Sequence, residues 1–184
     1  QIQTASNNLI DIVNNILDIS KIESGEDQVQ NKDYSINTLI NELTVVGNKK
    51  IGAKPVKLLV NVDNNISSVV SGDYGKLYQV LLNVLSNAIK FTDVGKITLS
   101  VNSTKNNGFE DIVFKINDTG VGIKEEDTNK IFNKFGKTDN VADVDGSGLG
   151  LAITKKYIEL LGGKIWFESQ YRVGSTFYVS ISQK

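Results

Sequence analysis

The stretch from residue 74 to residue 91 constrains the fold more than any other part of the chain, because it reads as one long helix. Its apolar residues recur at helical spacing and define one core-facing side: Leu77, Val80, Leu81, Val84, Leu85 and Ala88. Asp73 directly precedes the stretch and can cap its first turn. A helix with so apolar a side needs another layer to cover it.

That layer is expected to be a sheet. Apolar and β-branched runs predict strands at residues 28–33, 56–62, 96–103, 112–117, 164–169 and 176–182. Two more helices are expected at residues 35–47, capped by Ser35, and at residues 149–161, ended by Gly162 and Gly163. A polar loop at residues 104–111 separates two of the strands. Because strands and helices do not alternate regularly, we predict an α+β fold, a two-layer α/β sandwich with helices on one face of a mixed sheet.

One long helix is expected to precede this domain. Its apolar residues follow a heptad spacing with a second apolar face: Ile2, Ala5, Leu9, Ile12, Ile16 and Ile19, then Ile10, Val13 and Leu17. Two such faces favour a four-helix bundle, although a lone amphipathic helix folded onto the domain stays open. Gly25 is a suitable stop. We therefore divide the chain into residues 1–25 and a domain at residues 26–184.

Composition excludes several classes of function. The net charge is −1, from 20 basic and 21 acidic side chains, which argues against nucleic acid or an anionic membrane as the main partner. The chain has no cysteine and no histidine, which excludes disulfides, zinc–imidazole sites and Ser-His-Asp triads. No apolar run approaches the roughly 20 residues of a membrane helix. The chain begins at Gln1 and has no methionine, so we expect a piece of a longer protein.

The long helix carries an unusual polar stripe. Asn83, Asn87 and Lys90 lie at positions i, i+4 and i+7, so they share one side of the helix. An amide oxygen suits Mg²⁺, which takes hard oxygen ligands, and a lysine one turn away suits a phosphate oxygen. The stripe thus indicates a metal–phosphate site, and a solvated helix face is the alternative.

A second motif, DTGVGI at residues 118–123, follows the strand at residues 112–117. The Asp118 carboxylate is an acceptor and can take a hydrogen bond from the amino group of adenine. Glycines let the backbone approach a flat ligand. A tight turn with an Asx cap is the alternative. An aspartic protease would need two such loops, and the sequence has one.

A third motif, GSGLGL at residues 146–151, leads into the last expected helix. Glycines there expose free N–H groups at the positive end of the helix dipole, which indicates an anion site; a flexible loop with a helix cap is the alternative. The motif is neither a P-loop nor a Rossmann fingerprint. Phe132 and Phe135 are expected to anchor a lid, Lys137 to reach a phosphate, and Thr176 to complete a base pocket.

Together, and in this order, the segments at residues 83–90, 118–123, 132–135, 146–150 and 174–177 resemble the N, G1, F, G2 and G3 boxes of the histidine kinase ATP-binding domain. The segment VLLNVLSNAIKFT, residues 80–92, is especially similar. The first helix, ending LDISKIESG at Gly25, resembles the second helix of the family's dimerisation and phosphoacceptor hairpin. The resemblance implies the Bergerat α/β sandwich, shared with gyrase, Hsp90 and MutL-type ATPases.

The resemblance also implies cofactors and roles. ATP and Mg²⁺ are the implied cofactors, with Asn87 as the metal ligand and Asn83 and Lys90 as catalytic neighbours of the phosphates. Asp118 resembles the adenine-reading aspartate, and Lys137 a basic lid residue that contacts phosphate. The other residues implied to border the nucleotide are Phe91, Gly120, Gly122, Ile123, Gly146, Gly148, Leu149, Gly150 and Thr176.

An amide at Asn83 cannot act as the base that the matching glutamate supplies in ATP-hydrolysing relatives, so the site suits transfer of phosphate to another nucleophile. The acceptor histidine is implied to lie upstream of Gln1. The lid, residues 136–145, departs from the family by its three aspartates and by Gly136, where relatives often have a larger residue.

Implied partners are the phosphoacceptor helix of the full-length kinase, a response regulator receiver domain and a second copy of the chain, without nucleic acid. We expect a cytoplasmic domain of a membrane-anchored sensor from an AT-rich bacterial genome. An ATPase or serine kinase of the same fold, and a regulatory nucleotide-binding module, remain alternatives.

Overall fold

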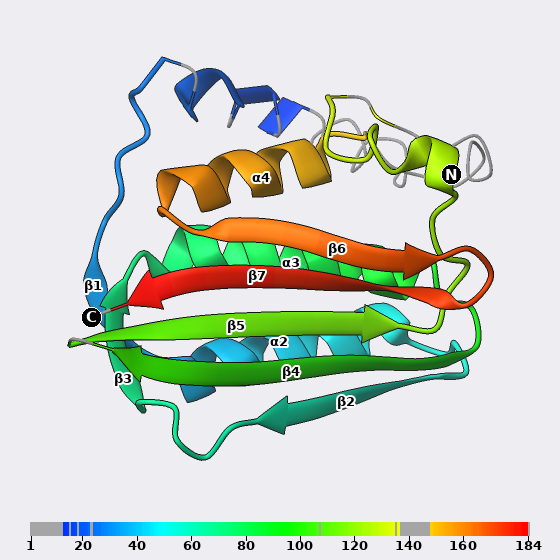
Figure 1. The fold of residues 1–184 in the computed structure, drawn as a ribbon, viewed down its shortest axis with the longest axis horizontal. Coiled ribbons are helices and arrows are strands. Elements are labelled where there is room, and N and C mark those ends of the chain that lie inside the picture. Colours follow the sequence, from blue (N-terminus) through cyan, green and yellow to red (C-terminus); the bar gives the residue numbers. More distant parts are fainter. Residues whose placement is uncertain are drawn as a thin grey trace.

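A five-stranded mixed sheet forms one layer of the computed structural model (Figure 1). In spatial order its strands are β2 (Val56–Val62), β4 (Gly95–Asn106), β5 (Phe109–Asp118), β7 (Gly174–Gln183) and β6 (Lys164–Gln170). β2 pairs with β4 in parallel, and the other neighbours pair antiparallel. The predicted mixed sheet is confirmed. The structure describes residues 13, 14, 16, 17, 19–22, 24–106, 108–134, 136 and 148–183.

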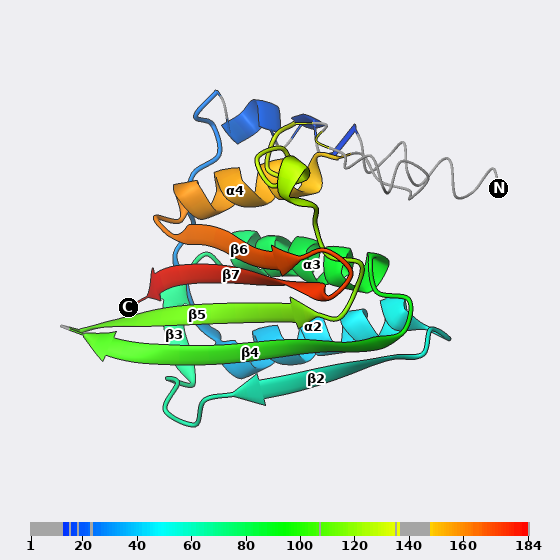
Figure 2. The ribbon, with the colours of Figure 1, turned by 45° about the vertical axis from the view of Figure 1, so that its right-hand side comes forward.

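Three helices cover one face of this sheet: α2 (Ile36–Ile51), α3 (Tyr74–Lys90) and α4 (Gly150–Leu160). Figures 1 and 2 show α2 and α3 behind the strands and α4 above β6 in both views, so the layers are a sheet and a row of helices. A separate two-stranded sheet pairs β1 (Lys32–Ser35) with β3 (Val69–Gly72). The predicted two-layer α+β sandwich is confirmed. No helix in the described part of the chain is long and apolar enough to cross a membrane.

The core lies between the two layers. Every residue predicted for the apolar side of α3 is buried there. The sheet contributes alternate residues, because successive side chains of a strand point to opposite faces. On β5 the buried members are Ile112, Phe114 and Ile116, each at most 2% exposed. Asp118 continues this inward row at the end of the strand, which places a carboxylate at the edge of the core.

Both predicted N-caps, of α2 and α3, are present in the structure, whereas the predicted end of α2 is not. Thr38 N donates to Ser35 Oγ at 3.3 Å, and Lys76 N donates to Asp73 Oδ1 at 3.1 Å, so both N-caps are confirmed. The predicted end of α2 at Gly47 is wrong, because the helix continues to Ile51 and its C-cap is Gly52, at φ 56°. Gly47 is buried inside α2. A Cβ there would lie 2.9 Å from a Leu58 methyl carbon, so the glycine permits close packing of helix on sheet.

Two predictions about the strands also need correction, and one strand was missed. The expected loop at residues 104–111 is wrong, because β4 and β5 continue as a long hairpin to Asn106 and Phe109. Polar residues extend both strands there, held by backbone pairing that composition does not show. The strand expected at residues 28–33 begins only at Lys32, and β3 was not predicted at all. Residues 56–62 form a strand as predicted.

The first helix is described only in part. Residues 13, 14, 16, 17 and 19–22 are helical, and Gly25, at φ 71°, follows as the predicted stop. Ile19 is 8% exposed and belongs to the core of the domain, whereas Val13, Ile16 and Leu17 are about half exposed. The helix thus gives one side to the domain and leaves another apolar side uncovered by the described residues. The remainder of the predicted heptad lies outside the described residues.

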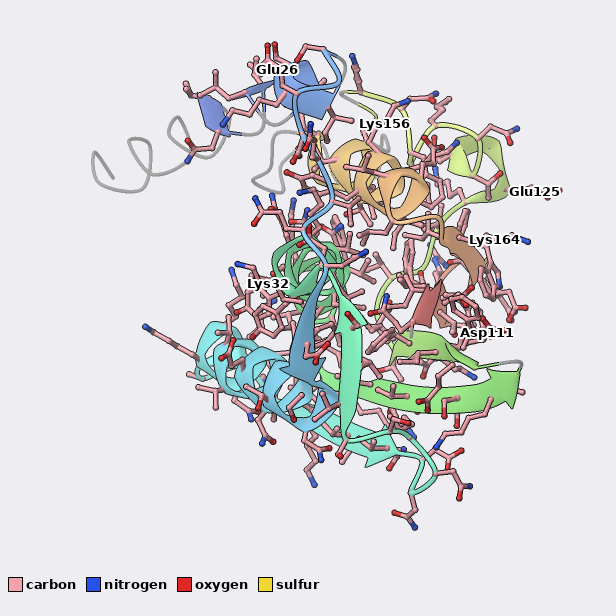
Figure 3. All side chains as sticks on the ribbon, turned by 90° about the vertical axis from the view of Figure 1, so that its left-hand side faces the viewer. Glu26, Lys32, Asp111, Glu125, Lys156 and Lys164 are labelled. Carbon is pink, nitrogen blue, oxygen red and sulfur yellow. The ribbon has the colours of Figure 1, made fainter. Side chains whose placement is uncertain are left out.

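An ion-pair cluster fastens the segment that follows this helix. Lys76 Nζ lies 2.8 Å from Asp27 Oδ1 and 3.3 Å from Asp73 Oδ2, and it donates to Gln28 O at 3.0 Å. Gln30 N also donates to Asp73 Oδ2, at 2.9 Å. Figure 3 shows the segment running from Glu26 past the helix ends to Lys32. The cluster therefore binds the connecting segment to the start of α3.

Candidate nucleotide-binding site

The polar stripe of α3 meets the beginning of α4. Asn83, Asn87 and Lys90 are all half-buried, and Asn83 Nδ2 donates to Gly150 O at 3.5 Å. Gly150 is the first residue of α4 and lies 67 positions away in sequence. Lys90 Nζ lies 4.9 Å from the centre of the Phe91 ring. The first amide of the stripe therefore faces the start of a second helix, and all three side chains of the stripe are partly withdrawn from solvent.

The start of α4 has the features of an anion site. Gly148 adopts φ 70°, Leu149 is buried in the core, and the helix begins at Gly150. The N-cap position belongs to Leu149, whose side chain makes no capping hydrogen bond. The first-turn N–H groups form the positive pole of the helix, close to Asn83, and the N-cap side chain does not occupy them. Gly146 and Lys137 lie outside the described residues.

Asp118 ends β5 as a buried carboxylate, 6% exposed. Its Oδ1 atom accepts from Gly120 N at 2.9 Å and from Ser175 N at 3.3 Å. Burial raises the pKa of Asp118, and these two backbone hydrogen bonds partly oppose that rise. Both bonds that the described residues make to this carboxylate fall on one oxygen. Oδ2 is the atom that can accept a hydrogen bond from a ligand.

The glycines after Asp118 permit close backbone contacts within the protein. A Cβ on Gly120 would lie 2.2 Å from Phe91 O, and one on Gly122, at φ 66°, would lie 2.1 Å from Gln170 O. Val121 N donates to Phe91 O at 3.2 Å. The sequence predicts that these glycines admit a flat ligand. The structure shows that they first let the loop fit between the end of α3 and the β6–β7 turn.

Thr176 and its neighbour Ser175 lie on opposite faces of β7. Asn117 Nδ2 donates to Thr176 Oγ1 at 2.8 Å, and the two residues are register partners in β5 and β7. Because side chains alternate along a strand, this pair lies on the sheet face opposite Asp118. Ser175, the register partner of Asp118, is buried on the inner face, and the place of Thr176 in a base pocket stays a prediction.

Ser169 is a further polar residue beside this loop that the sequence analysis missed. Ile123 N donates to Ser169 Oγ at 2.8 Å, which ties the loop after Asp118 to β6. Strand alternation around the buried Phe177 would have pointed to Ser175 and, across the pair, to Ser169. Neither serine stands out by composition, and Ser169 is found only through the pairing of β6 with β7.

Aromatic contacts hold the segment that follows. The Phe132 and Phe167 rings lie 5.9 Å apart, and Phe167 stacks on Phe177 at 5.5 Å. Phe132 therefore packs on the inner face of the sheet, as expected for an anchor, whereas Phe135 lies outside the described residues. A Cβ on Gly136 would lie 2.1 Å from Lys130 O, so a tight turn explains the glycine at this position.

Residues 72–184 match the family described as histidine kinase-, DNA gyrase B- and HSP90-like ATPase. The chain therefore belongs to this family, as the order of its motifs and the mixed sheet indicated. Over 183 residues it is 37% identical to hybrid signal transduction histidine kinase B of Dictyostelium discoideum, covering 98% of this chain and 9% of that protein. It is 34% identical over 186 residues to signal transduction histidine-protein kinase BarA of Escherichia coli K12, covering 98% of this chain and 20% of that protein.

Solved structures agree with the fold. Full-length ShkA in complex with AMPPNP matches with a TM-score of 0.85 at 25% identity, over 97% of this chain and 36% of that one. The catalytic domain of histidine kinase ThkA matches with a TM-score of 0.66 at 31% identity, over 84% and 98%. The chain thus spans a small part of the curated relatives. Since these include a eukaryote, the expected bacterial origin stays a prediction.

Proposed function

We propose that this domain binds Mg-ATP and transfers the γ-phosphoryl group to a histidine outside these 184 residues, as one step of two-component signal transduction. The observation that carries the proposal is the contact between Asn83 and Gly150. It brings the polar stripe of α3 to the start of α4, where the positive end of the helix dipole would attract a phosphate chain. The names of the relatives and the AMPPNP in the ShkA complex support the same reading.

The site residues suit such a ligand. Asp118 Oδ2 can accept the adenine amino group, while Lys90 and the α4 N–H groups can attract the phosphates. Mg²⁺ fits the donor set, because the Asn87 amide offers one hard oxygen and this ion is usually completed by nucleotide phosphates and water. Bound Mg²⁺ would neutralise phosphate charge. Lys137 and Gly146 keep their proposed phosphate contacts, and Phe91 its place beside the base or ribose.

Transfer rather than hydrolysis follows from two features of the residues. Asn83 carries an amide, which cannot activate water as a base. The chain contains no histidine, so the phosphoryl acceptor must come from elsewhere. Phosphoryl transfer depends mainly on positioning and on charge neutralisation, which the site residues can supply.

The wider assembly is part of this proposal. Residues 1–25 would form the second helix of a dimerisation and phosphoacceptor hairpin, and residues 26–184 the ATP-binding domain. The partners would be the histidine-bearing helix of the full-length kinase, a second copy of that chain and a response regulator receiver domain. We place the domain on the cytoplasmic side, where ATP is available, within a membrane-anchored sensor.

Calorimetric titration with Mg-ATP tests the pocket. A hydrogen bond to a charged group is worth about 1.5–3 kcal/mol, so Asp118→Ala should weaken binding by about 10- to 150-fold. Asn87→Ala should lose mainly the Mg²⁺-dependent part of the affinity. Asp111→Ala is the matched control, because this aspartate is exposed on the same strand and should leave binding unchanged. Wild-type protein that binds no adenine nucleotide would contradict the proposal.

A second assay tests the reaction. Labelled phosphate from ATP should appear on a separately added hairpin that bears the acceptor histidine, and not on a hairpin with that histidine replaced by glutamine. Tight ATP binding without any transfer would favour a regulatory module. Steady ATP hydrolysis by the chain alone would favour an ATPase.

A further inference from the structure

Ser169 joins three segments around the proposed base pocket through one hydroxyl group. Its Oγ atom accepts from Ile123 N at 2.8 Å, donates to Gly174 O at 3.1 Å and lies 2.9 Å from Ser175 Oγ. Ile123 belongs to the loop after Asp118, and Gly174 opens β7. The side chain is half-buried and faces its register partner Ser175. One side chain of β6 thus holds both the loop and the start of β7.

The hydrogen-bonding capacity of a hydroxyl decides the direction of these bonds. A serine hydroxyl donates one hydrogen bond and accepts two. Ser169 meets all three contacts only if it donates to Gly174 O and accepts from Ile123 N and from the Ser175 hydroxyl. Ser175 then points its hydroxyl hydrogen at Ser169. The position of Ser175 is therefore coupled to Ser169.

Ser175 and Gly174 in turn contact Asp118. Ser175 N donates to Asp118 Oδ1 at 3.3 Å, and a Cβ on Gly174 would lie 2.1 Å from Asp118 O. Any shift of this turn moves the donor that fixes one oxygen of the carboxylate. Since Oδ1 is held, the direction in which Oδ2 points is set by the same contacts.

We infer that Ser169 is a positioning residue for adenine recognition: through Ser175 and Gly174 it fixes the orientation of the Asp118 carboxylate. Ser169 makes no direct contact with Asp118 among the hydrogen bonds of the described residues. The inference rests on the proposed function, because it assumes that Asp118 accepts the amino group of adenine.

The test compares ATP with purine riboside triphosphate, which lacks the amino group on the ring. The ratio of the two dissociation constants reports the Asp118 contact alone, whereas a general loosening of the fold weakens both ligands together. Wild type should prefer ATP by about 10- to 150-fold, and Asp118→Ala should show a ratio near one. Ser169→Ala should lower the wild-type ratio by about 2- to 12-fold, the worth of one neutral hydrogen bond.

Two variants serve as controls. Ser169→Thr keeps the hydroxyl and should retain the wild-type ratio. Ser182→Ala removes an exposed hydroxyl from the outer face of β7 and should also retain it. If Ser169→Ala does not fold, as judged by circular dichroism, Ser169→Cys replaces it, because a thiol fills the same space with a weaker hydrogen-bonding group.

The outcomes separate the two claims. Equal weakening of both ligands by Ser169→Ala, with a high wild-type ratio, overturns the role of Ser169 and leaves adenine reading by Asp118 intact. A wild-type ratio near one overturns adenine reading itself, and the positioning role with it. A lowered ratio in Ser169→Ala that Ser169→Thr restores supports the inference.

Discussion

Replacing Lys76 by methionine tests whether the ion-pair cluster at the start of α3 stabilises the domain. The side chains of Lys76, Asp27 and Asp73 are only 13%, 19% and 8% exposed. Removing one partner of a buried ion pair costs about 3–5 kcal/mol, because a charge is left uncompensated. Asp73 keeps its two backbone N–H donors in the variant, and Asp27 can rehydrate. We therefore expect a loss of about 2–3 kcal/mol, or about 4–12 °C in Tm.

The shifted pKa values of Asp73 and Lys76 set the pH range in which the ion-pair cluster stabilises the domain. Burial opposes the charge on both Asp73 and Lys76, but their hydrogen bonds and mutual attraction outweigh it, so the pKa of Asp73 is lowered and the pKa of Lys76 is raised. The Asp73 contribution is present above its unfolded pKa, about 3.9, and is lost as the pH falls through the lowered value. The Lys76 contribution is present below its unfolded pKa, about 10.4, and is lost as the pH rises through the raised value.

Thermal unfolding of wild type and Lys76→Met between pH 2 and pH 9 measures the size of the loss and its dependence on the charge of Asp73. The difference in Tm should be full near pH 7 and should shrink at the acid end. Lys124→Met is the control, because its ion pair with Glu126 is more exposed and should contribute less than 1 kcal/mol. A difference in Tm that is the same at pH 7 and at the acid end would refute the electrostatic explanation and point to lost packing alone.

Three further substitutions test individual contacts of the site. Gly122→Ala should destabilise the domain more than Gly108→Ala in urea unfolding, because both glycines have φ above +60° but only Gly122 would push a Cβ into a backbone carbonyl. Similar losses in the two variants would contradict the close-approach argument. Asp118→Asn should raise Tm at pH 7 while it weakens ATP binding. Burial raises the pKa of this carboxyl, so its ionised form lowers the stability of the folded state. The gain in Tm should shrink as the pH falls through the raised pKa, because the wild-type carboxyl is then neutral as well. A lower Tm at pH 7 would refute that reasoning. Thr176→Val should change the ATP affinity by no more than about twofold, which is less than the loss of one hydrogen bond. The Thr176 hydroxyl accepts from Asn117 on the face of the sheet opposite Asp118. A larger loss of affinity in calorimetry would show that Thr176 contacts the nucleotide.

The sequence could predict those elements whose apolar periodicity is strong. The core side of α3 and the strand at residues 56–62 are examples. In each, the spacing of the apolar residues is compatible with burial of one face only. The N-caps Ser35 and Asp73 could also be predicted, because their side chains are typical of that position. The end of α2 could not be predicted, because Gly47 lies within the helix and packs against Leu58. In sequence, a helical glycine that packs against a distant strand looks the same as a glycine that ends a helix.

The residues of the candidate site also fall into those that local sequence predicted and those that depend on strand pairing. Local motifs indicated Asp118 and the stripe with Asn83, since each carries its chemistry within one element. Alternation around Phe177 puts Ser175, not Thr176, on the buried face, but its place opposite Asp118 depends on the register of β7 against β5. The role of Ser169 depends in addition on the pairing of β6 with β7. Register is a long-range property, and a shift of one residue exchanges the two faces of a strand.

Backbone hydrogen bonds hold the loop at the proposed base end of the site. There the loop after Asp118 is held by Val121 N donating to Phe91 O, and by Arg172 N donating to Val121 O at 2.7 Å. At the phosphate end, the described link between α3 and α4 is the longer bond from Asn83 to Gly150. If the base binds here as proposed, the entropy of ordering that loop is lost on folding and not on binding, so the site would be preorganised for a flat base. The phosphates would then contribute through charge and Mg²⁺, which would suit the proposed transfer of the terminal phosphoryl group to another chain segment.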